Sequence, residues 1–430
     1  MRILWITNQP VPVIAEDMGA PAGISGGWMN ELSRQLAEKN IMGMVFPIPK
    51  NNEYREGSAG NIHYYALPMD KKVVRKSQKH TECFEKIIKS FRPDIIHIWG
   101  TEYVHTFLAV NACKNVEMLD RTVISIQGLV SVISRHFYGH IEEKKLNIPT
   151  IKDFLYRDSL KKQCKNFIMR GKYEIASIRM VNHVIGRTDW DYACTSQINP
   201  EVHYHFCNET LRNFFYQKQW RLESCERYSL FVSQCQYPLK GFHHALEALA
   251  IIVKKYPNAH LYTTGRELLK DDVKEKLFDS RYDRYIREQI RILHLEKNVT
   301  FLGTLSEKEM CEQFCKTHVF ISASSIENSP NSVGEAMLLG VPVVASDVGG
   351  VKNLLVHAQE GFVYQADAPY MLAYYVSRIF ENDELAEKFS VNGRAHALQT
   401  HNKERNLVQL TDIYQKIVRE AESEDNRASQ

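Results

Sequence analysis

Two glutamates, Glu327 and Glu335, stand eight positions apart in a run whose residue types could bind an anion and place a carboxylate beside it. Ser329 followed by Pro330 is typical of a helix start, with serine as the N-cap and proline at the first helical position. The apolar residues 319–322 predict a strand leading into this turn. One glutamate would therefore lie in the turn and the other one turn into the helix.

The first turn of this predicted helix is suited to a phosphate. The amides of Asn331, Ser332 and Val333 would lack intrahelical partners, and the helix dipole adds partial positive charge to them. Gly334 removes a side chain where a ligand would approach. The alternative is an ordinary amphipathic helix with a solvated Glu335, and the pattern taken alone favours that alternative.

The composition limits the elements that can hold these residues. The chain has 430 residues, 44% of them hydrophobic, which is enough for two α/β domains. The formal net charge is only +3, so bulk charge gives no reason to expect a nucleic-acid partner. Nine scattered cysteines do not form the dense framework of a secreted domain, and no apolar stretch is long enough to span a bilayer. We therefore expect a cytoplasmic protein.

Strands and helices alternate along almost the whole chain, which predicts parallel sheets with helices on both faces. Strands are expected at residues 3–7, 44–48, 63–67, 95–98, 123–126 and 181–185, with helices at 28–38 and 83–90. After a polar stretch at 208–227 the pattern starts again, with strands at 230–233, 260–264, 299–302, 319–322 and 343–345. This predicts an α/β protein of two Rossmann-like, doubly wound domains facing across a cleft, at residues 1–210 and 211–401.

Glycines follow several predicted strands, where a backbone would have to approach a ligand closely. Gly26 and Gly27 come after the first strand, but neither a dinucleotide fingerprint nor a Gly-x4-Gly-Lys-Ser/Thr loop is present. In the second half Lys240 precedes Gly241 at a helix start. A lysine there can supply charge to a phosphate, and a solvated surface lysine is the alternative.

Together these segments resemble the retaining glycosyltransferases of family four, which have the GT-B fold. The resemblance is carried by the Glu327-x7-Glu335 pair, by Gly303, by Lys240-Gly241 at the expected distance upstream, and by residues 340–350 and 360–363. The first half matches the family at fewer positions, which are residues 26–27, 93–97 and 127–129.

The resemblance implies roles for individual residues. Glu335 would hydrogen-bond the ribose of a nucleotide, and Glu327 would lie against the donor sugar. Lys240 would neutralise the diphosphate, and the helix-start amides would hold the distal phosphate. The remaining residues assigned to donor binding are Asn331, Ser332, Val333, Gly334, Gly303, Gly26 and Gly27.

The resemblance also implies a reaction. A hexosyl or N-acetylhexosaminyl group would move from a nucleotide-diphosphate sugar to an acceptor hydroxyl with retention, in polysaccharide or glycoconjugate biosynthesis. No cofactor or metal is implied, because lysine, arginine and helix-start amides would carry the leaving-group charge. As in relatives, a helix at residues 402–420 would return to the first domain, and the polar tail at 421–430 is expected to be disordered.

Three positions depart from the pattern of relatives. Gln234 stands where many relatives have arginine, and Arg266 is a candidate substitute for the missing charge. Gln127 stands where many have histidine; it can donate to a sugar or orient the acceptor but cannot act as a base. Residues 207–209, in the linker expected between the two domains, replace the Pro-Asn-Gly that is usual in relatives. Two alternatives to transfer stay open: a nucleotide-sugar epimerase of the same fold, and a non-catalytic nucleotide-sugar-binding subunit.

The acceptor is expected to be a carbohydrate or a lipid-linked carbohydrate, bound by the first domain. Residues 186–191 follow a predicted strand and open a helix, so Arg187 and Trp190 could contact the acceptor together with Gln127. Structural capping of that helix, by Thr188 or Asp189, is the alternative.

Basic residues cluster at two places in the first half. They are Lys71, Lys72, Arg75, Lys76 and Lys79 in one cluster, and Lys161, Lys162 and Lys165 in the other. Each basic residue near an anionic lipid surface can contribute about 1 kcal/mol. If the acceptor is lipid-linked, these stretches could hold the protein peripherally at the inner face of the membrane, and solvated helix faces are the alternative.

Overall fold

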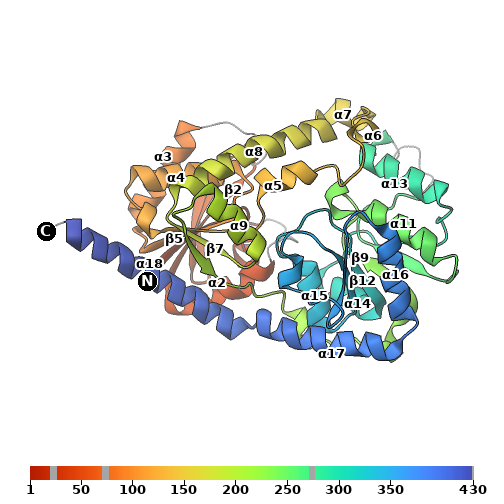
Figure 1. Cartoon of the computed structure of the whole chain (residues 1–430). Coiled ribbons are helices and arrows are strands. Elements are labelled where there is room, and N and C mark those ends of the chain that lie inside the picture. Colours follow the sequence, from red (N-terminus) through yellow and green to blue (C-terminus); the bar gives the residue numbers. More distant parts are fainter. Residues whose placement is uncertain (20–26, 70–76, 271–276, 429–430) are drawn as a thin grey trace. The chain divides into compact units, whose positions relative to one another are not determined.

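The computed structural model describes residues 1–19, 27–69, 77–270 and 277–428, and the chain divides into two compact units. The N-terminal unit comprises Met1–Ser134, Asn166–Thr210 and His401–Gln430, and the C-terminal unit comprises Arg135–Lys165 and Leu211–Thr400. Figure 1 follows the chain through both. Each unit is built on a largely parallel sheet with covering helices, so the predicted α/β class with two Rossmann-like domains is confirmed.

The N-terminal sheet has the order β3-β4-β2-β1-β5-β6-β7-β8, and β3 alone among these strands runs antiparallel to its neighbour. Its strands are β1 (Arg2–Ile6), β2 (Ile41–Ile48), β3 (Arg55–Ala59), β4 (Ile62–Pro68), β5 (Ile95–Trp99), β6 (Thr122–Ser125), β7 (His183–Gly186) and β8 (His203–Phe206). The strands β5, β6 and β7 are buried along their whole length, as a sheet covered on both faces requires.

Helices cover both faces of this sheet. They are α1 (Pro12–Asp17), α2 (Gly27–Lys39), α3 (Gln78–Phe91), α4 (Val104–Asn115), α5 (Val130–Ile133), α9 (Asp189–Ile198), α18 (Lys403–Ala428) and most of α8 (Leu160–Met180), with the 3-10 turn η1 (Leu119–Arg121); a second 3-10 turn, η2 (Ser134–His136), begins at the last residue of this part of the unit. One apolar cluster joins the sheet to α2 and α18, and a second joins it to α3, α4 and α8. In the first cluster Trp5 donates its indole N–H to Tyr414 at 3.0 Å.

The C-terminal sheet is parallel throughout, with the order β11-β10-β9-β12-β13-β14. Its strands are β9 (Glu226–Val232), β10 (His260–Thr263), β11 (Val299–Phe301), β12 (Thr317–Ser322), β13 (Val343–Ser346) and β14 (Gly361–Tyr364). The helices are α6 (Glu143–Leu146), α7 (Ile151–Tyr156), α10 (Phe214–Gln217), α11 (Phe242–Ile252), α13 (Arg281–Ile292), α14 (Glu307–Lys316), α15 (Asn331–Leu339), α16 (Pro369–Phe380) and α17 (Asp383–Thr400), with 3-10 turns η3 (Leu222–Ser224), η4 (Pro238–Lys240) and η5 (Val351–Asn353).

The two units differ from the predicted domain limits in one segment. Residues 135–165 belong to the C-terminal unit although they precede β7 of the N-terminal unit. His243 of α11 donates to the carbonyl of Gly139 at 2.8 Å, and Arg281 of α13 donates to the carbonyl of Lys145 at 2.6 Å. These contacts join residues more than a hundred positions apart, so no local sequence pattern announces them.

The C-terminal end also differs from the prediction. Helix α18, assigned to the N-terminal unit, continues to Ala428, so most of the expected disordered tail is helical. The glutamates, alanine and arginine of this stretch are good helix formers, and Ala421 is still buried. In the part of the chain that the structure describes, no helix combines the length and apolar character needed to cross a bilayer.

Candidate active site

Two neighbouring strands of the C-terminal sheet deliver the central residues of the site. The chain passes from the end of β9 through η4 to Lys240, and from the end of β12 through a loop to Glu327. Because β9 and β12 pair in parallel, both loops lie at the same edge of the sheet. Lys240 Nζ is 2.5 Å from Glu327 Oε1, and the Ser324 hydroxyl donates to the same oxygen at 2.7 Å. The lysine and one glutamate of the predicted pair therefore form an ion pair.

Two glycines permit this close approach of loops. Gly241 has a φ of 66°, and a Cβ there would lie 1.8 Å from the carbonyl oxygen of Ala323. Gly349 has a φ of 49°, and its Cβ would lie 1.8 Å from the carbonyl oxygen of Glu327. The amide of Gly350 donates to that same carbonyl at 3.2 Å. Only glycine fits at these two positions, so they fix the backbone that carries the ion pair.

A small pocket lies beside the ion pair. It is lined by residues from the ends of β9 and β12 and from the first turn of α15: Val232, Ser233, Gln234, Lys240, Phe320, Ile321, Ser322, Ala323, Ser324, Glu327 and Ser332. Gln234 is thus in the pocket, at the position where many relatives have arginine. Lys240 supplies the positive charge of this lining.

The start of α15 is one residue later than predicted. Pro330, not Ser329, is the N-cap, and no side chain caps the helix. The amide of Val333 donates to the carbonyl of Pro330 at 3.0 Å, so it is engaged within the turn rather than directed at a ligand. The amides of Asn331 and Ser332 belong to the first helical turn, where no intrahelical acceptor exists, and Ser332 lines the pocket. These two amides remain the donors that could meet an anion.

Glu335 is buried, which overturns the solvated-helix alternative. Its side chain is 6% exposed, and its two carboxylate oxygens accept from Nε and Nη2 of Arg212, each at 2.6 Å. Burial raises the pKa of Glu335, and the hydrogen bonds and charge of Arg212 act in the opposite direction. The Arg212 guanidinium also lies over the ring of Phe215, 4.7 Å from its centroid. Gly334, beside the glutamate, is buried in the same helix.

Sequence reasoning missed Arg212. It lies in the polar stretch that opens the C-terminal unit, 123 residues before its partner, where a solvated arginine would be unremarkable. The signal that could have found it is the apolar character of α15, which buries every residue from Val333 to Leu339. A carboxylate buried in such a helix needs a cation to stay ionised.

Residues 213–396 match the family model described as glycosyl transferases group 1. YtcC of Bacillus subtilis (strain 168), assigned as a glycosyltransferase, is 24% identical over 421 residues, which cover 97% of this chain and 93% of that protein. Sucrose-phosphate synthase from Thermosynechococcus elongatus superposes with a TM-score of 0.69 at 16% identity, over 97% of this chain and 99% of that one. The protein is a GT-B glycosyltransferase.

A further solved structure of the same fold contains UDP-glucose. Anabaena Alr3699/HepE in complex with UDP-glucose superposes on this glycosyltransferase with a TM-score of 0.62 at 16% identity, over 98% of this chain and 99% of that one.

Two other residues assigned to donor binding follow β10 and β11 of the glycosyltransferase. Gly303 has a φ of 71°, with no atom within 4 Å of a Cβ built there, and its carbonyl accepts from the amide of Gly265 at 2.9 Å. Arg266 forms ion pairs with Asp279 and, at 3.3 Å, with Asp283. Arg266 is not among the residues that line the Lys240 pocket, so the structure does not bring it to the place of the missing arginine.

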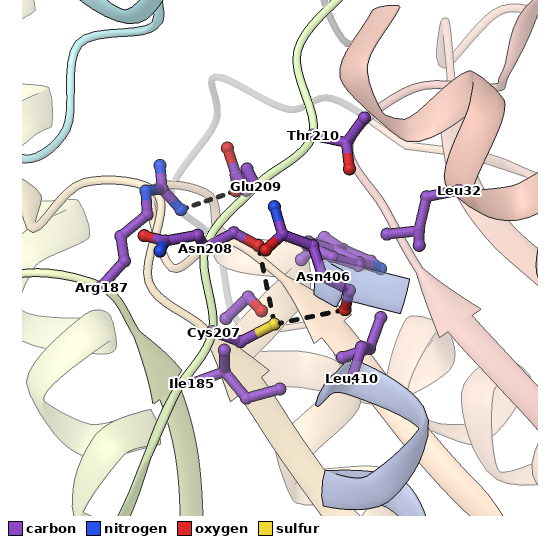
Figure 2. A pocket seen from close by; sticks show the side chains of 11 residues that line it. Leu32, Ile185, Arg187, Cys207, Asn208, Glu209, Thr210, Asn406 and Leu410 are labelled. Carbon is purple, nitrogen blue, oxygen red and sulfur yellow. Dashed lines mark hydrogen bonds and ion pairs between the residues drawn. The ribbon is translucent and has the colours of Figure 1, made fainter. Parts of the chain in front are cut away.

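The N-terminal unit of the glycosyltransferase has a pocket of its own, shown in Figure 2. Arg187 Nη1 lies 2.6 Å from Glu209 Oε1, and the two side chains are only 7% and 6% exposed. Gln127 donates its Nε2 to the same carboxylate oxygen at 2.5 Å. Leu32 and Leu410 line another part of the pocket. The structure thus brings Gln127 and Arg187 together through Glu209, a residue that sequence reasoning treated only as part of the linker.

The remaining first-domain predictions have different outcomes. Trp190 packs against the apolar cluster beneath α3 and α4 and does not line this pocket. Thr188 is the cap of α9, in a capping box with Asp191, so the capping alternative describes this turn. Gly27 is the first residue of α2, whereas Gly26 lies outside the described residues.

Two carboxyl groups near the ends of β5 and β6, those of Glu102 and Glu174, were not among the residues predicted from the sequence. Glu174 is 1% exposed and accepts from the hydroxyl of Thr101 at 2.6 Å and from the amides of Val130 and Ser131, each at 2.9 Å. Burial, with a smaller contribution from the negative charge of Glu174, raises the pKa of Glu102 to about 7. The N-terminal unit therefore carries a carboxyl group that titrates near neutral pH.

Proposed function

We propose that this glycosyltransferase is a retaining enzyme that moves a hexosyl or N-acetylhexosaminyl group from a UDP sugar to an acceptor hydroxyl, in the assembly of a polysaccharide or glycoconjugate. The proposal is carried by the Lys240–Glu327 ion pair, 2.5 Å long, in a pocket that also contains the start of α15. A cation, a carboxylate and helix-start amides in one pocket suit a sugar joined to a diphosphate. The UDP-glucose bound by the Anabaena protein supports uridine as the base.

Glu335 would bind the nucleotide ribose while it stays paired with Arg212. An ionised carboxylate offers about four acceptor positions on its two oxygens. Arg212 occupies one position on each oxygen, so each can still accept from one ribose hydroxyl. The hydrogen bonds and charge of the guanidinium oppose the rise in pKa that burial causes, and so favour the ionised carboxylate that these hydrogen bonds require.

The diphosphate would be neutralised without a resident metal. An ammonium group has three donors, and Glu327 engages Lys240 on one side only. The other donors can reach a phosphate oxygen in the pocket. The amides of Asn331 and Ser332 and the dipole of α15 would add to this charge stabilisation, which grows as the diphosphate leaves.

The proposed reaction exchanges one bond at the anomeric carbon for another. The bond from that carbon to the diphosphate oxygen breaks, and a bond to the acceptor oxygen forms on the same face of the sugar. The acceptor hydroxyl proton passes to the released diphosphate. Glu327 would stabilise the positive charge that develops on the sugar ring, since its carboxylate lies in the pocket beside Lys240.

Donor binding is tested by thermal stabilisation with UDP, GDP, ADP and their sugar conjugates, each without and with magnesium. We expect a rise in Tm with the uridine nucleotides that does not depend on magnesium, because a ligand that binds only the folded state stabilises it. Glu335→Ala should reduce the shift. Glu312→Ala is the matched control, because this glutamate is a partly exposed residue of α14 paired with Lys218.

Turnover is tested by following UDP release from UDP sugars with candidate acceptors. Glu327→Gln should lower kcat roughly 100- to 1,000-fold while nucleotide binding persists. Proton NMR of the first product should show the donor's anomeric configuration, and inversion would contradict retention. Conversion of the donor sugar without an acceptor would favour an epimerase, and nucleotide binding without turnover on any acceptor would favour a binding subunit.

A further inference from the structure

Residues 135–165 of the C-terminal unit begin as a well-anchored segment. Ile141 and Leu146 are buried, and α6 packs on α13 (Figure 1). The positive φ of Gly139, 60°, brings its backbone against the carbonyl of Pro238, where a Cβ would lie 2.2 Å away. The start of this segment therefore belongs to the core of the unit.

Beyond α6 the same segment turns its apolar side chains to solvent. Helix α7 has no buried residue, although Thr150 and Asp153 close a capping box at its start. Its exposed side chains and the one that precedes it are Ile148 (49%), Ile151 (49%), Phe154 (85%), Leu155 (58%) and Tyr156 (63%). Phe154 has the largest exposure of any large hydrophobic side chain in the described part of the chain.

We call these five exposed side chains the α7 apolar face. Ile151, Phe154 and Leu155 have the i, i+3, i+4 spacing that places side chains on one side of a helix. The ring of Tyr156 lies 6.5 Å from that of Phe278, which is also exposed, so the surface extends beyond the helix. A single exposed apolar residue needs no explanation, but five within nine positions indicate a surface that binds something.

The segment that carries this face is rich in basic residues. Residues 142–165 contain seven lysines and arginines and four aspartates and glutamates, so this short segment carries +3, as much as the formal net charge of the whole chain. Glu142 is already paired with Lys144 and Lys145, at 2.6 and 3.2 Å. The basic residues that follow α7 in the chain are Arg157, Lys161, Lys162 and Lys165, and all four are exposed.

We propose that the α7 apolar face docks this protein on an anionic phospholipid surface. Phe154 and Leu155 would enter the boundary between headgroups and acyl chains, Tyr156 would lie at the headgroup level, and the flanking lysines would meet lipid phosphates. The charge favours lipid over a protein partner, because lysine is depleted from protein interfaces whereas it contributes at anionic membranes.

Of the two basic clusters considered in the sequence, only the second takes part in this proposed membrane contact. Lys161, Lys162 and Lys165 adjoin the α7 apolar face in sequence, whereas residues 71–76 lie outside the described residues. Apolar insertion and charge together supply the two contributions that stable peripheral binding needs.

The test is co-sedimentation of the full-length protein with vesicles of phosphatidylcholine alone or mixed with phosphatidylglycerol, at low and high salt. We expect binding to the mixed vesicles that weakens with salt. Phe154→Ser with Leu155→Ser should lower the partition coefficient at least about tenfold, since two large side chains lose their transfer from water. Lys161→Gln with Lys165→Gln should lower it roughly tenfold and flatten the salt dependence.

The matched control is Tyr370→Ser with Val391→Ser, which removes two similarly exposed apolar side chains of the same unit, at α16 and α17. It should bind the mixed vesicles like the unchanged protein. All these positions are exposed, so circular dichroism and Tm should be unchanged, and a variant that has lost its fold would be recognised.

Three results would overturn the proposal. The protein could ignore anionic vesicles at low salt, or bind them equally well after the Phe154 and Leu155 replacements. It could instead form a concentration-dependent dimer that those replacements abolish, without binding vesicles, which would make a second copy the partner of this face. Vesicle binding is measured without nucleotide or acceptor. A failure to bind vesicles would therefore not contradict the proposed transfer reaction, and a failure of transfer would not contradict membrane docking.

Discussion

Both units of this glycosyltransferase bury carboxylates at the carboxyl ends of parallel strands, but they treat them differently. In the C-terminal unit Glu327 is paired with Lys240 and Glu335 with Arg212. In the N-terminal unit Glu209 is paired with Arg187, whereas Glu174 is satisfied by hydroxyls and amides. One unit therefore places a cation beside each glutamate of its site, and the other relies partly on neutral donors.

The difference agrees with the proposed function, in which the C-terminal unit would bind the nucleotide donor and the N-terminal unit the acceptor. A nucleotide diphosphate brings negative charge, so acids in its site must already be balanced, and helix-start amides must supply the surplus. A carbohydrate acceptor is neutral and binds through hydroxyl groups, for which amides, hydroxyls and protonated acids are suitable partners. Substitutions at these carboxylates, at their partners and at the glycines beside them would test this comparison.

The largest effect is expected from Arg187→Met in the N-terminal unit. This change leaves Glu209 buried without its cation, and we expect the unit to lose about 3–5 kcal/mol of unfolding free energy. Calorimetry and chemical denaturation measure this loss. Because the pair lies in the N-terminal unit, UDP binding to the folded protein should be preserved.

The double variant Arg187→Met, Glu209→Gln provides the control for this prediction. It removes both charges, and much of the lost stability should return. If the single variant is as stable as the unchanged protein and fails only in transfer to acceptor, the pair serves acceptor binding and not the fold.

The next prediction compares the loss of stability caused by alanine at two glycines of the C-terminal unit. Gly349→Ala places a Cβ 1.8 Å from the Glu327 carbonyl oxygen at positive φ, and should cost about 2–4 kcal/mol of stability and displace the ion pair. Gly303→Ala has a similar φ but open space around its Cβ, so only about 1 kcal/mol of backbone strain is expected. Denaturant unfolding of both variants measures the difference, and equal losses would show that contact with Glu327 plays no part.

A smaller effect on binding is expected from Arg212→Met. Without the guanidinium, burial raises the pKa of Glu335 further, and a protonated Glu335 is a poorer acceptor for ribose hydroxyls. UDP affinity should fall about 10- to 100-fold and should recover partly as the pH rises, since higher pH restores the carboxylate.

Isothermal calorimetry at a series of pH values checks this prediction. Arg227→Met is the matched control, because Arg227 pairs with Asp383 at the surface of the same unit. A loss of UDP affinity that is the same at every pH would mean that Arg212 acts without altering the ionisation of Glu335.

The sequence was sufficient where chemistry follows from fixed spacing along the chain. Glu327 and Glu335 lie on one turn and helix, and Lys240 precedes a glycine at a helix start, so a local pattern contained all three. The strand positions were also predictable, because buried parallel strands are continuous apolar runs. Among the strands, β3 and β14 were not predicted.

The sequence was insufficient where two interacting side chains come from separate elements of the fold. Arg212 meets Glu335, and Arg187 meets Glu209, only through folding, and no spacing rule connects them. The assignment of residues 135–165 to the C-terminal unit rests on contacts with α11 and α13 that lie far along the chain. Which buried acid keeps its charge is likewise a property of the packed structure.

The smallest effect concerns the carboxyl group of Glu102 in the N-terminal unit, where burial outweighs the attraction of Arg170. The pKa of Glu102 is raised by burial from an ordinary 4.5 to about 7. Between these values the unfolded chain has lost the proton that the folded protein keeps. The stabilisation from this proton is therefore complete below pH 4.5 and is lost as the pH rises to about 7.

Glu102→Gln removes this pH dependence, because glutamine does not titrate. The variant should gain about 1–3 kcal/mol relative to the unchanged protein between pH 4.5 and pH 7, with no further gain above pH 7. Calorimetric Tm values across this range measure the gain, and Glu82→Gln, at an exposed position of α3, is the control. A gain that does not vary with pH would mean that Glu102 is ionised in the folded protein, and the contrast between the two units would then rest on Glu174 alone.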